Sequence, residues 1–505
     1  MGRSHTEIAI VGAGLSGLGM AKALRAAGME DFVVLERAPD LGGTWRDNAY
    51  PGCACDIPSV LYCYRDEPNP TWSRAYAPQP EIWEYIRAVA RRHGLERRIR
   101  YEHELTRARF DETLDRWKLE AREPSGEIHR LTARVLISAA GALADPALPN
   151  IVGLERFAGT SFHSARWNHA HRLKGRRVAV VGTGASAIQF VPEIQPHVGR
   201  LTLFQRAAPW VLPHSNPDLP AAWRHHLARR PRLEALARAA VFSGQDALHV
   251  AFQHPRLARL VEQQGRAHIR RHIADPELRR RLTPDFRLGC KRILRSNTWY
   301  PAIARDNVEL VTSPIRAVMG GGILDGQGVH HAVDTIIFAT GFHVTDPPIA
   351  ERIEGRGGRV LSEVWAGSPR THLGMSVAGF PNLFFLLGPN TGLGHNSVLL
   401  MIEAQIGYLR RLLDHRTRVA AAAVEPTPQA QAAFVAEVDR GTEGSVWTAG
   451  GCRSWYLDRT GRNSALWPGS VRAYERRLRR FEPGDYTWAP PRPSPAAADA
   501  ESARA

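Results

Sequence analysis

The stretch that decides the fold is residues 8–36, IAIVGAGLSGLGMAKALRAAGMEDFVVLE. Its first four residues form a short apolar run, as expected of a buried parallel strand. A helical pattern follows over residues 15–27 and stops at Gly28, a residue type that commonly ends helices. A second apolar run covers residues 32–35. The stretch therefore predicts a β–α–β unit of the kind that builds a parallel sheet.

Three glycines in the turn of this unit, and an acid at its end, match the pattern that binds a dinucleotide. Gly12 allows the tight turn, Gly14 lets the backbone approach a pyrophosphate, and Gly17 lets the helix pack closely on the strand. The helix N-terminus adds unpaired N–H groups and partial positive charge. Glu36, after the second strand, can accept a hydrogen bond from a ribose 2′-hydroxyl. We therefore expect a first dinucleotide site, which suits the adenosine of FAD.

The same pattern returns later in the chain. Residues 177–181 predict a strand, the turn reads Gly182-x-Gly184-x-x-Ala187, and another apolar strand follows. No acid closes this second strand; Arg206 stands there, and a cation favours the 2′-phosphate of NADPH. A surface arginine without a ligand is the alternative reading of Arg206. Two dinucleotide sites in one chain indicate an oxidoreductase in which one nucleotide delivers hydride and the other accepts it.

The rest of the chain is arranged around these two units. We expect an α/β fold with two Rossmann-like dinucleotide-binding domains and a helical insertion, because one long segment is rich in Arg and Leu with few strand runs. The C-terminal end is rich in Pro, Ala and Ser, which is typical of a disordered tail. The expected parts are an FAD-binding domain (residues 1–148 and 343–488), an NADPH-binding domain (149–212 and 287–342), the helical insertion (213–286) and the tail (489–505).

The composition narrows the class of protein. Of 505 residues, 44% are hydrophobic and 23% are charged, as in ordinary globular proteins. Lys and Arg number 66 against 50 Asp and Glu, so the formal net charge is +16. Such an excess can indicate nucleic-acid binding. The arginine runs are scattered over separate predicted helices without the stacking aromatics that single strands need, so we expect no nucleic-acid partner.

Cysteine usage and hydropathy give two further expectations. The five cysteines are an odd number and too few for a disulfide scaffold, which predicts reduced thiols and a cytoplasmic protein. Cys53, Cys55 and Cys63 cluster without a zinc spacing, so we expect packed free thiols and no metal. The apolar stretch over residues 8–20 is broken by glycines and is too short to span a membrane.

A segment between the two β–α–β units carries a family resemblance. Residues 157–168, FAGTSFHSARWN, resemble the fingerprint of type I Baeyer–Villiger monooxygenases, Phe-x-Gly-x-x-x-His-x-x-x-Trp followed by Pro or Asp. Trp167 distinguishes them from the related flavin-containing monooxygenases, which usually have another aromatic residue there. Asn168 departs from the pattern. The resemblance covers roughly residues 5–485. It implies FAD, NADPH and oxygen, and conversion of a small-molecule ketone to an ester or lactone through a C4a-peroxyflavin; a flavin-containing monooxygenase acting on nitrogen or sulfur is the alternative.

Two loops resemble the flavin side of that family. Gly43, Thr44 and Trp45 look like one flavin-side loop, and Asp56 matches the family aspartate near the flavin ring. The resemblance implies that Asp56 pairs with Arg292 and orients it. On composition alone, an Asp before Ile and Pro is more often a turn or cap residue.

Further segments resemble the nicotinamide side. Lys291 and Arg292 match the family's Gly-x-Lys-Arg segment, in which the Lys contacts the 2′-phosphate and the Arg lies over the flavin. Thr340 and Gly341 match the Ala-Thr-Gly element of two-nucleotide flavoproteins. Trp455 matches a tryptophan that touches the nicotinamide cofactor, although a core or interface aromatic is an equal reading.

The resemblance also assigns roles. A guanidinium is always charged and offers several donors, so Arg292 is the residue expected to hold an anionic peroxide and a tetrahedral adduct. His163 and Trp167 are expected to position the linker between domains, or simply to be packed. The loop over residues 388–397 precedes a helix; either its helix N-terminus faces the flavin pyrimidine, or it is a glycine-rich surface loop capped by Ser397.

Overall fold

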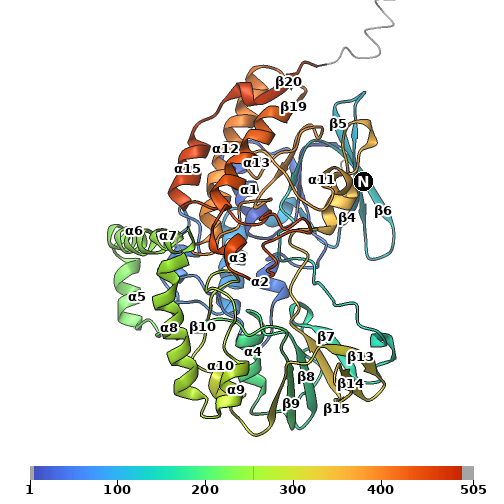
Figure 1. Cartoon of the computed structure of the whole chain (residues 1–505). Coiled ribbons are helices and arrows are strands. Elements are labelled where there is room, and N and C mark those ends of the chain that lie inside the picture. The colour runs from blue at the N-terminus through green and yellow to red at the C-terminus, as the bar shows by residue number, and fades with distance from the viewer. Residues whose placement is uncertain (1–4, 254, 492–505) are drawn as a thin grey trace, which may run out of the picture.

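Two β-sheets, each covered by helices, organise the chain (Figure 1). The structure is a computed structural model that describes residues 5–253 and 255–491. The first sheet has eight strands in the order β17-β4-β5-β6-β1-β2-β3, with β18 also paired to β6. Its strands are β1 (His5–Val11), β2 (Phe32–Leu35), β3 (Ile99–Arg100), β4 (Glu104–Asp111), β5 (Arg116–Arg122), β6 (Ile128–Ser138), β17 (Ile353–Glu354) and β18 (Leu383–Phe385).

The second sheet is parallel throughout and has five strands in the order β12-β9-β8-β16-β7. Its strands are β7 (Thr160–His163), β8 (Arg177–Val181), β9 (Arg200–Phe204), β12 (Val308–Val311) and β16 (Thr335–Phe338). These strands come from both of the segments expected to form the second domain. The residue boundaries of the expected domains stay a prediction.

Smaller strand pairs and the helices complete the fold. The small sheets are β10 (Val211–Leu212) with β11 (Leu294–Arg295), β13 (Ile315–Met319) with β14 (Gly322–Asp325) and β15 (His330–Ala332), and β19 (Ala423–Pro426) with β20 (Tyr486–Ala489). The α-helices are α1 (Leu15–Ala26), α2 (Thr44–Asp47), α3 (Gln79–Arg92), α4 (Ala187–Ile194), α5 (Ala221–Ala228), α6 (Pro231–Ala247), α7 (His249–Gln253), α8 (Pro255–His272), α9 (Pro276–Arg281), α10 (Trp299–Ile303), α11 (Leu361–Trp365), α12 (Val398–Arg418), α13 (Pro428–Thr442), α14 (Val446–Ala449) and α15 (Val471–Arg479).

The α/β class expected from the sequence is confirmed. Strands β2 and β8 have the bounds read from the apolar runs, because buried parallel strands are apolar on both faces. Helix α1 ends one residue earlier than expected, and Gly28 adopts φ +76° just after it. One apolar core continues from the first sheet into the second, so the two sheets share a buried junction.

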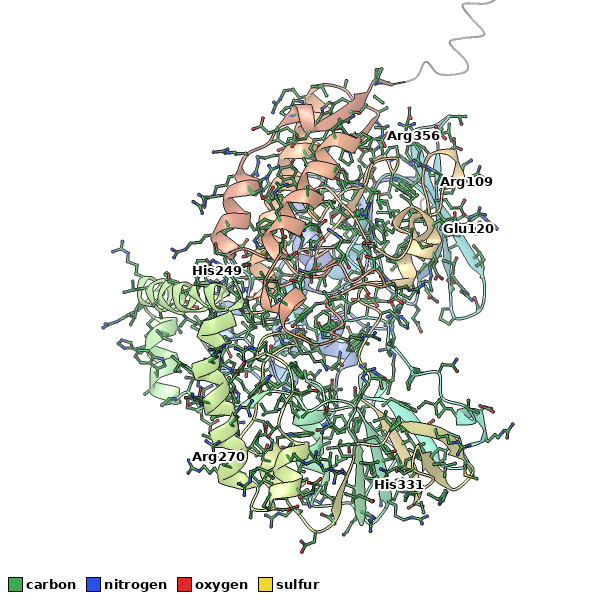
Figure 2. All side chains as sticks on the ribbon, in the orientation of Figure 1. Arg109, Glu120, His249, Arg270, His331 and Arg356 are labelled. Carbon is green, nitrogen blue, oxygen red and sulfur yellow. A yellow bond between two sulfur atoms is a disulfide. The ribbon has the colours of Figure 1, made fainter. Side chains whose placement is uncertain are left out.

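Helices α5 to α9 fall within the segment expected to be a helical insertion, and α5 to α8 lie along one side of the molecule (Figure 1). Arginines are spread over both ends of the molecule. Figure 2 shows Arg109 on β4 and Arg356, just after β17, at one end of the molecule, and Arg270 on α8 at the other end.

One expectation about cysteine is wrong. Cys290 and Cys452 form a disulfide, although the odd count predicted reduced thiols throughout. The fold brings their Cα atoms to 6.1 Å across a sequence separation of 162, which spacing in the sequence does not reveal. Cys53, Cys55 and Cys63 are buried and free, as expected.

The expected disordered tail, residues 489–505, is wrong at its first residue. Ala489, placed in the disordered tail, is the last residue of β20 and pairs with Ala423. The expected tail beyond residue 491 lies outside the described residues. Within residues 5–253 and 255–491, no helix is long and apolar enough to cross a membrane.

Candidate active site

The first glycine turn has the geometry that a pyrophosphate needs. Gly12 adopts φ +104°, and a Cβ there would lie 2.6 Å from the carbonyl oxygen of Ala139. A Cβ at Gly17 would overlap the carbonyl oxygen of Gly12, so α1 can approach β1 only without that side chain. Gly14 is different, because the one atom near its absent Cβ is the Cα of Gly43, at 3.8 Å. The turn is therefore open at the position that faces a phosphate.

The loop before α2 forms the opposite wall of this turn. Gly42 donates its N–H to the carbonyl of Ala13 (2.9 Å), and Gly43 adopts φ +52° as the residue before Thr44. A Cβ at Gly43 would lie 3.2 Å from the Cα of Gly14, so the two backbones leave a cradle that side chains would fill.

Trp45 is buried beneath this loop. It is 8% exposed, and its Nε1 donates to the hydroxyl of Tyr62 (2.9 Å). Trp45 therefore supports the flavin-side loop from the core.

Glu36 lies at the end of β2, beside the glycine turn. It is 4% exposed and accepts N–H bonds from Ala13 (2.8 Å) and Ala38 (3.0 Å). Arg46 also reaches it, with 3.2 Å between Nη1 and Oε1. Sequence reasoning missed Arg46, although it directly follows the matched Trp45 in the chain. This pair holds the carboxylate in place beside the glycine turn.

The second glycine turn repeats the arrangement. Gly182 adopts φ +107°, and a Cβ there would overlap the carbonyl of Ala339. Gly184 is exposed and has no atom within 4 Å of the position of its absent Cβ. Ala187 is fully buried as the first residue of α4, which explains why a small side chain is tolerated at the third position.

Two cations stand beside this second turn. Burial lowers the pKa of Lys291, and the nearby positive charge of Arg206 lowers it further, so the two cations are close in space. Nζ of Lys291 lies 4.8 Å from the ring centre of Phe286. Across residues 5–253 and 255–491, neither cation has a carboxylate partner within ion-pair distance. The charge of Asp285 opposes the lowering of the Lys291 pKa from beyond ion-pair distance, and a phosphate at this turn would neutralise both cations directly.

Asp56 and Arg292 meet across 236 residues of sequence. Arg292 donates from Nε to Oδ2 (2.5 Å) and from Nη2 to Oδ1 (2.7 Å), a two-point pair. The side chains are 39% and 24% exposed, respectively. Desolvation opposes charge on both groups, yet the Arg292 charge holds the pKa of Asp56 below its usual value, and Asp56 raises that of Arg292. The contact expected between these two residues is present, and both stay charged.

Arg292 also touches two C-terminal segments. Its Nη1 donates to the carbonyl of Leu393 (3.4 Å). Burial raises the pKa of Tyr456 to about 12, and the adjacent Arg292 charge opposes that rise. Tyr456, which is 1% exposed, is a neighbour of Arg292 that sequence reasoning did not single out. Trp455 beside it is 44% exposed, so it is not a core aromatic.

The loop over residues 388–397 is not a surface loop. Asn390, Thr391, Asn396 and Ser397 are at most 2% exposed. Ser397 caps α12 by accepting the N–H of Leu399 (3.3 Å), so the capping role is confirmed, whereas the surface-loop alternative is wrong. Nδ2 of Asn396 is buried and has no hydrogen-bond partner among the described residues, which fits a polar ligand atom next to the start of α12.

The family-like segment before β8 is packed at the junction of the two sheets. His163 is buried, its Nδ1 accepts the N–H of Ala165 (3.1 Å), and burial and the Arg166 charge lower its pKa to about 4. Trp167 packs edge-on against Phe162 with 5.2 Å between ring centres. These contacts fit packing or linker support, and neither side chain lies against the Asp56–Arg292 pair.

Helix α4 is tied directly to the flavin-side loop. The Tyr50 hydroxyl donates to Oε1 of Gln189 (2.9 Å), and Nε2 of Gln189 donates to the carbonyl of Ala54 (3.0 Å). Thr340, after β16, donates its hydroxyl to the carbonyl of Ala147 (2.6 Å). Gly341 adopts φ +86° with open space at its absent Cβ. Polar contacts therefore link α4, which begins at the second glycine turn, to the loop with Tyr50 and Ala54, and Gln189 was not foreseen in this role.

Comparison with known proteins agrees with this geometry. The family model described as "FMO-like: Flavin-binding monooxygenase-like" matches residues 5–230. A "Baeyer-Villiger monooxygenase" of Streptomyces coelicolor is 45% identical over 503 residues, covering 99% of this chain and 96% of the relative. The chain belongs to the Baeyer–Villiger monooxygenases.

Two solved monooxygenase structures match nearly the whole chain. A steroid monooxygenase bound to NADP has 31% identity and a TM-score of 0.84, covering 96% of this chain and all of the other. The OTEMO complex with FAD and NADP has 26% identity and a TM-score of 0.86, covering 96% and 99%. The expected resemblance and the fold with two dinucleotide-binding domains are confirmed.

Proposed function

We propose that this chain is an FAD- and NADPH-dependent monooxygenase that uses oxygen to convert a ketone into an ester or lactone. The observation that carries the proposal is the charged Asp56–Arg292 pair, since Arg292 is next to Lys291 and contacts the loop before α12. A permanent cation is therefore held at the loop before α12 and next to Lys291, and such a cation stabilises the negative charge that an oxygen-transfer reaction on a carbonyl develops.

The residues present fit both cofactors. For FAD, the open cradle of the first turn would hold the pyrophosphate, Glu36 would hold the ribose, and the loop before α12 would face the ring. For NADPH, the open turn at Gly184 would hold the pyrophosphate, and Arg206 and Lys291 would neutralise the 2′-phosphate. When bound, the two cofactors supply electron transfer and oxygen activation. The residues contributing to these sites would be Gly12, Gly14, Gly17, Glu36, Gly43, Thr44, Trp45 and Asp56 for FAD, and Gly182, Gly184, Ala187, Arg206, Lys291, Thr340, Gly341 and Trp455 for NADPH.

Arg292 would stabilise the negative oxygen that forms when the ketone carbonyl is attacked. A guanidinium keeps its charge at every working pH and presents donors in a fixed plane. Asp56 occupies Nε and Nη2, so Nη1 is the nitrogen that could turn from Leu393 toward a substrate oxygen. Because the pKa of Asp56 is lowered, the carboxylate stays ionised and holds the guanidinium plane.

Product analysis tests the proposal. The holoenzyme is supplied with NADPH, air, and either a ketone panel or a thioether, and the products are identified by mass. Ester or lactone from a ketone supports the proposal. Sulfoxide from the thioether with no ester from any ketone would instead indicate the flavin-containing type, which oxygenates sulfur or nitrogen.

A variant pair assigns the reaction to the site. Arg292→Ala should lose ester formation, whereas Arg107→Ala should retain it. Arg107 makes a similar two-point pair with Glu354 (2.6 and 2.9 Å), but between β4 and β17. Unchanged ester formation by Arg292→Ala would remove this residue from the mechanism.

We also propose a cytoplasmic location, which the three free, buried cysteines support.

A further inference from the structure

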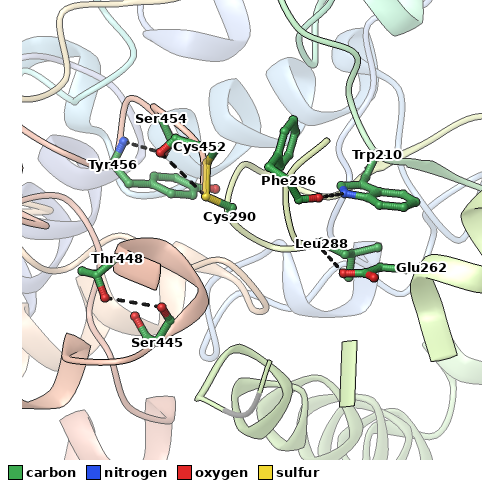
Figure 3. Close-up of a disulfide and its surroundings, with 10 residues drawn as sticks. All are labelled: Trp210, Glu262, Phe286, Leu288, Cys290, Ser445, Thr448, Cys452, Ser454 and Tyr456. Atoms are coloured by element: carbon green, nitrogen blue, oxygen red, sulfur yellow. Dashed lines mark hydrogen bonds between the residues drawn. A yellow bond between two sulfur atoms is a disulfide. The ribbon is translucent and has the colours of Figure 1, made fainter. Parts of the chain in front are cut away.

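The disulfide joins the two chain segments that surround Arg292. Cys290 precedes Lys291 and Arg292, and Cys452 lies in the loop that carries Trp455 and Tyr456. Figure 3 shows the bond beside the ring of Tyr456. One covalent bond therefore links the segment holding the active-site cation to the segment packed against it.

The backbone around the bond is built for close approach. A Cβ at Gly450 would lie 2.8 Å from Cβ and 2.9 Å from Sγ of Cys290, so a side chain there would displace the bond. Gly450 also accepts the N–H of Arg287 (2.9 Å). Residues 450–456 lie in neither a helix nor a strand, although Tyr456 donates its N–H to Oγ of Ser454 (3.0 Å). The disulfide is thus the covalent restraint on a loop without regular structure, which the buried ring of Tyr456 also anchors.

The bond is accessible from one side. Cys290 is fully buried, whereas Cys452 is half-buried and follows the exposed Gly451. The remaining cysteines are poor competitors for thiol chemistry. Burial raises the pKa of Cys53 to about 12 and also raises that of Cys63, which keeps both as unreactive thiols. Thiol exchange should therefore act selectively at the disulfide.

We propose that Cys290–Cys452 is a redox-controlled clamp on the active site, and this inference rests on the proposed function. A dithiol reductant attacks the Cys452 sulfur, and a second thiolate of the same reductant completes the exchange. Two electrons and two protons convert the protein disulfide into two thiols, while the dithiol becomes a disulfide. A low-molecular-weight disulfide reverses the change. Opening the bond frees the loop with Trp455 and Tyr456 from the segment with Arg292.

The clamp explains why one chain has both free cysteines and a disulfide. Three cysteines are free and buried, as in proteins of reducing compartments, yet two others are positioned for a bond next to the catalytic cation. A reducing environment would hold the enzyme in its open, less efficient form, and oxidation would close the bond. The apolar cluster shared by Trp210, Phe286, Trp447 and Tyr456 keeps the segments near one another when the bond is open.

The first test counts thiols in the holoenzyme purified without reductant. After unfolding and alkylation, three of the five cysteines should be alkylated, and a peptide pair should link residues 290 and 452. After treatment with dithiothreitol, all five should be alkylated. Five alkylated cysteines before any reductant would overturn the proposal.

The second test compares function with and without reductant. Dithiothreitol should raise the KM for NADPH and lower the ester formed per NADPH consumed, each by about tenfold or more. The reason is that the loop with Trp455 and Tyr456 is then no longer held in register with Arg292, and small displacements of reacting groups slow a reaction strongly. Oxidised glutathione should restore both quantities. Cys452→Ser should resemble the reduced enzyme and ignore dithiothreitol, whereas Cys63→Ser keeps the bond and should respond like the parent.

Affinity for NADP⁺, measured by quenching of protein fluorescence, separates this proposal from the proposed function. If no ketone gives an ester but dithiothreitol still weakens NADP⁺ binding, the proposed function fails and the clamp stands. If ester forms and reductant alters neither NADP⁺ affinity nor ester yield, the clamp is overturned. The reductant series on the parent decides the matter even if Cys452→Ser does not fold.

Discussion

Replacing Asp56 by asparagine should lower ester formation by about thirtyfold. The change keeps one acceptor oxygen, but it removes the negative charge and turns an N–H₂ group toward the guanidinium of Arg292. At about 4 Å between charge centres and an effective dielectric constant of about 20, the full attraction is about 4 kcal/mol. Partial exposure of both side chains, 39% and 24%, reduces this figure to about 2 kcal/mol, in the range measured for charged hydrogen bonds. That energy corresponds to about thirtyfold in rate.

The assay separates orientation of Arg292 from general damage. Ester formation, NADPH consumption and hydrogen peroxide release are measured on Asp56→Asn holoenzyme with saturating ketone. We expect ester formation to fall more than NADPH consumption, with peroxide accounting for the difference. Glu354→Gln is the matched control, because it disrupts a similar two-point pair with Arg107 between two strands of the first sheet.

Two results would refute this reasoning. Ester formation by Asp56→Asn within about twofold of the parent would show that the carboxylate does not position Arg292. An equal loss in Glu354→Gln would show that the effect comes from lost stability. A thermal unfolding midpoint measured for each variant distinguishes the second case from an effect at the site.

Three more outcomes follow from the geometry. Gly17→Ala should prevent assembly of the flavin-bound fold, because its Cβ overlaps the backbone of Gly12 and destabilises the fold by at least about 4 kcal/mol. Gly244→Ala is the control, since its Cβ meets nothing within 4 Å, and its flavin absorbance should equal that of the parent. Arg206→Ala and Lys291→Ala should each raise the KM for NADPH by about ten- to hundredfold while leaving that for NADH nearly unchanged, and a parallel rise for NADH would contradict a 2′-phosphate contact. Burial and the Arg166 charge lower the pKa of His163 from 6.5 to about 4, so the unfolded chain takes up this proton more readily. Its contribution to the free energy of unfolding should be constant above about pH 6.5 and fall by up to about 3 kcal/mol toward pH 4. Because the pKa of His372 is lowered as well, denaturant titrations of His163→Gln should show a shallower slope than the parent, and an unchanged slope would contradict this assignment.

The two glycine turns were predictable because each is a local feature. Tight turns, close helix packing and buried strands depend on neighbours within about one β–α–β unit, and the residues that provide them lie within that unit. The bounds of β2 and β8 and the positive φ values of Gly12 and Gly182 follow from such local rules. The sequence left open whether the loop before α12 is exposed, since its composition does not show which segments cover it.

The contact between Asp56 and Arg292 could not be derived from local sequence patterns. Asp56 and Arg292 are 236 residues apart, and their contact was expected only through a family resemblance. Gln189 and Tyr456 were missed for the same reason, because each contacts a segment distant in the chain.

The sequence by itself determined two dinucleotide-binding units and the residue types that could serve them, because these patterns are written in short, continuous stretches. Only the tertiary structure decided which distant residues meet. It brought Cys290 to Cys452 although the count of cysteines predicted reduced thiols. Long-range proximity depends on how the two sheets and the C-terminal loop pack together, and this packing sums weak apolar contacts over the whole chain.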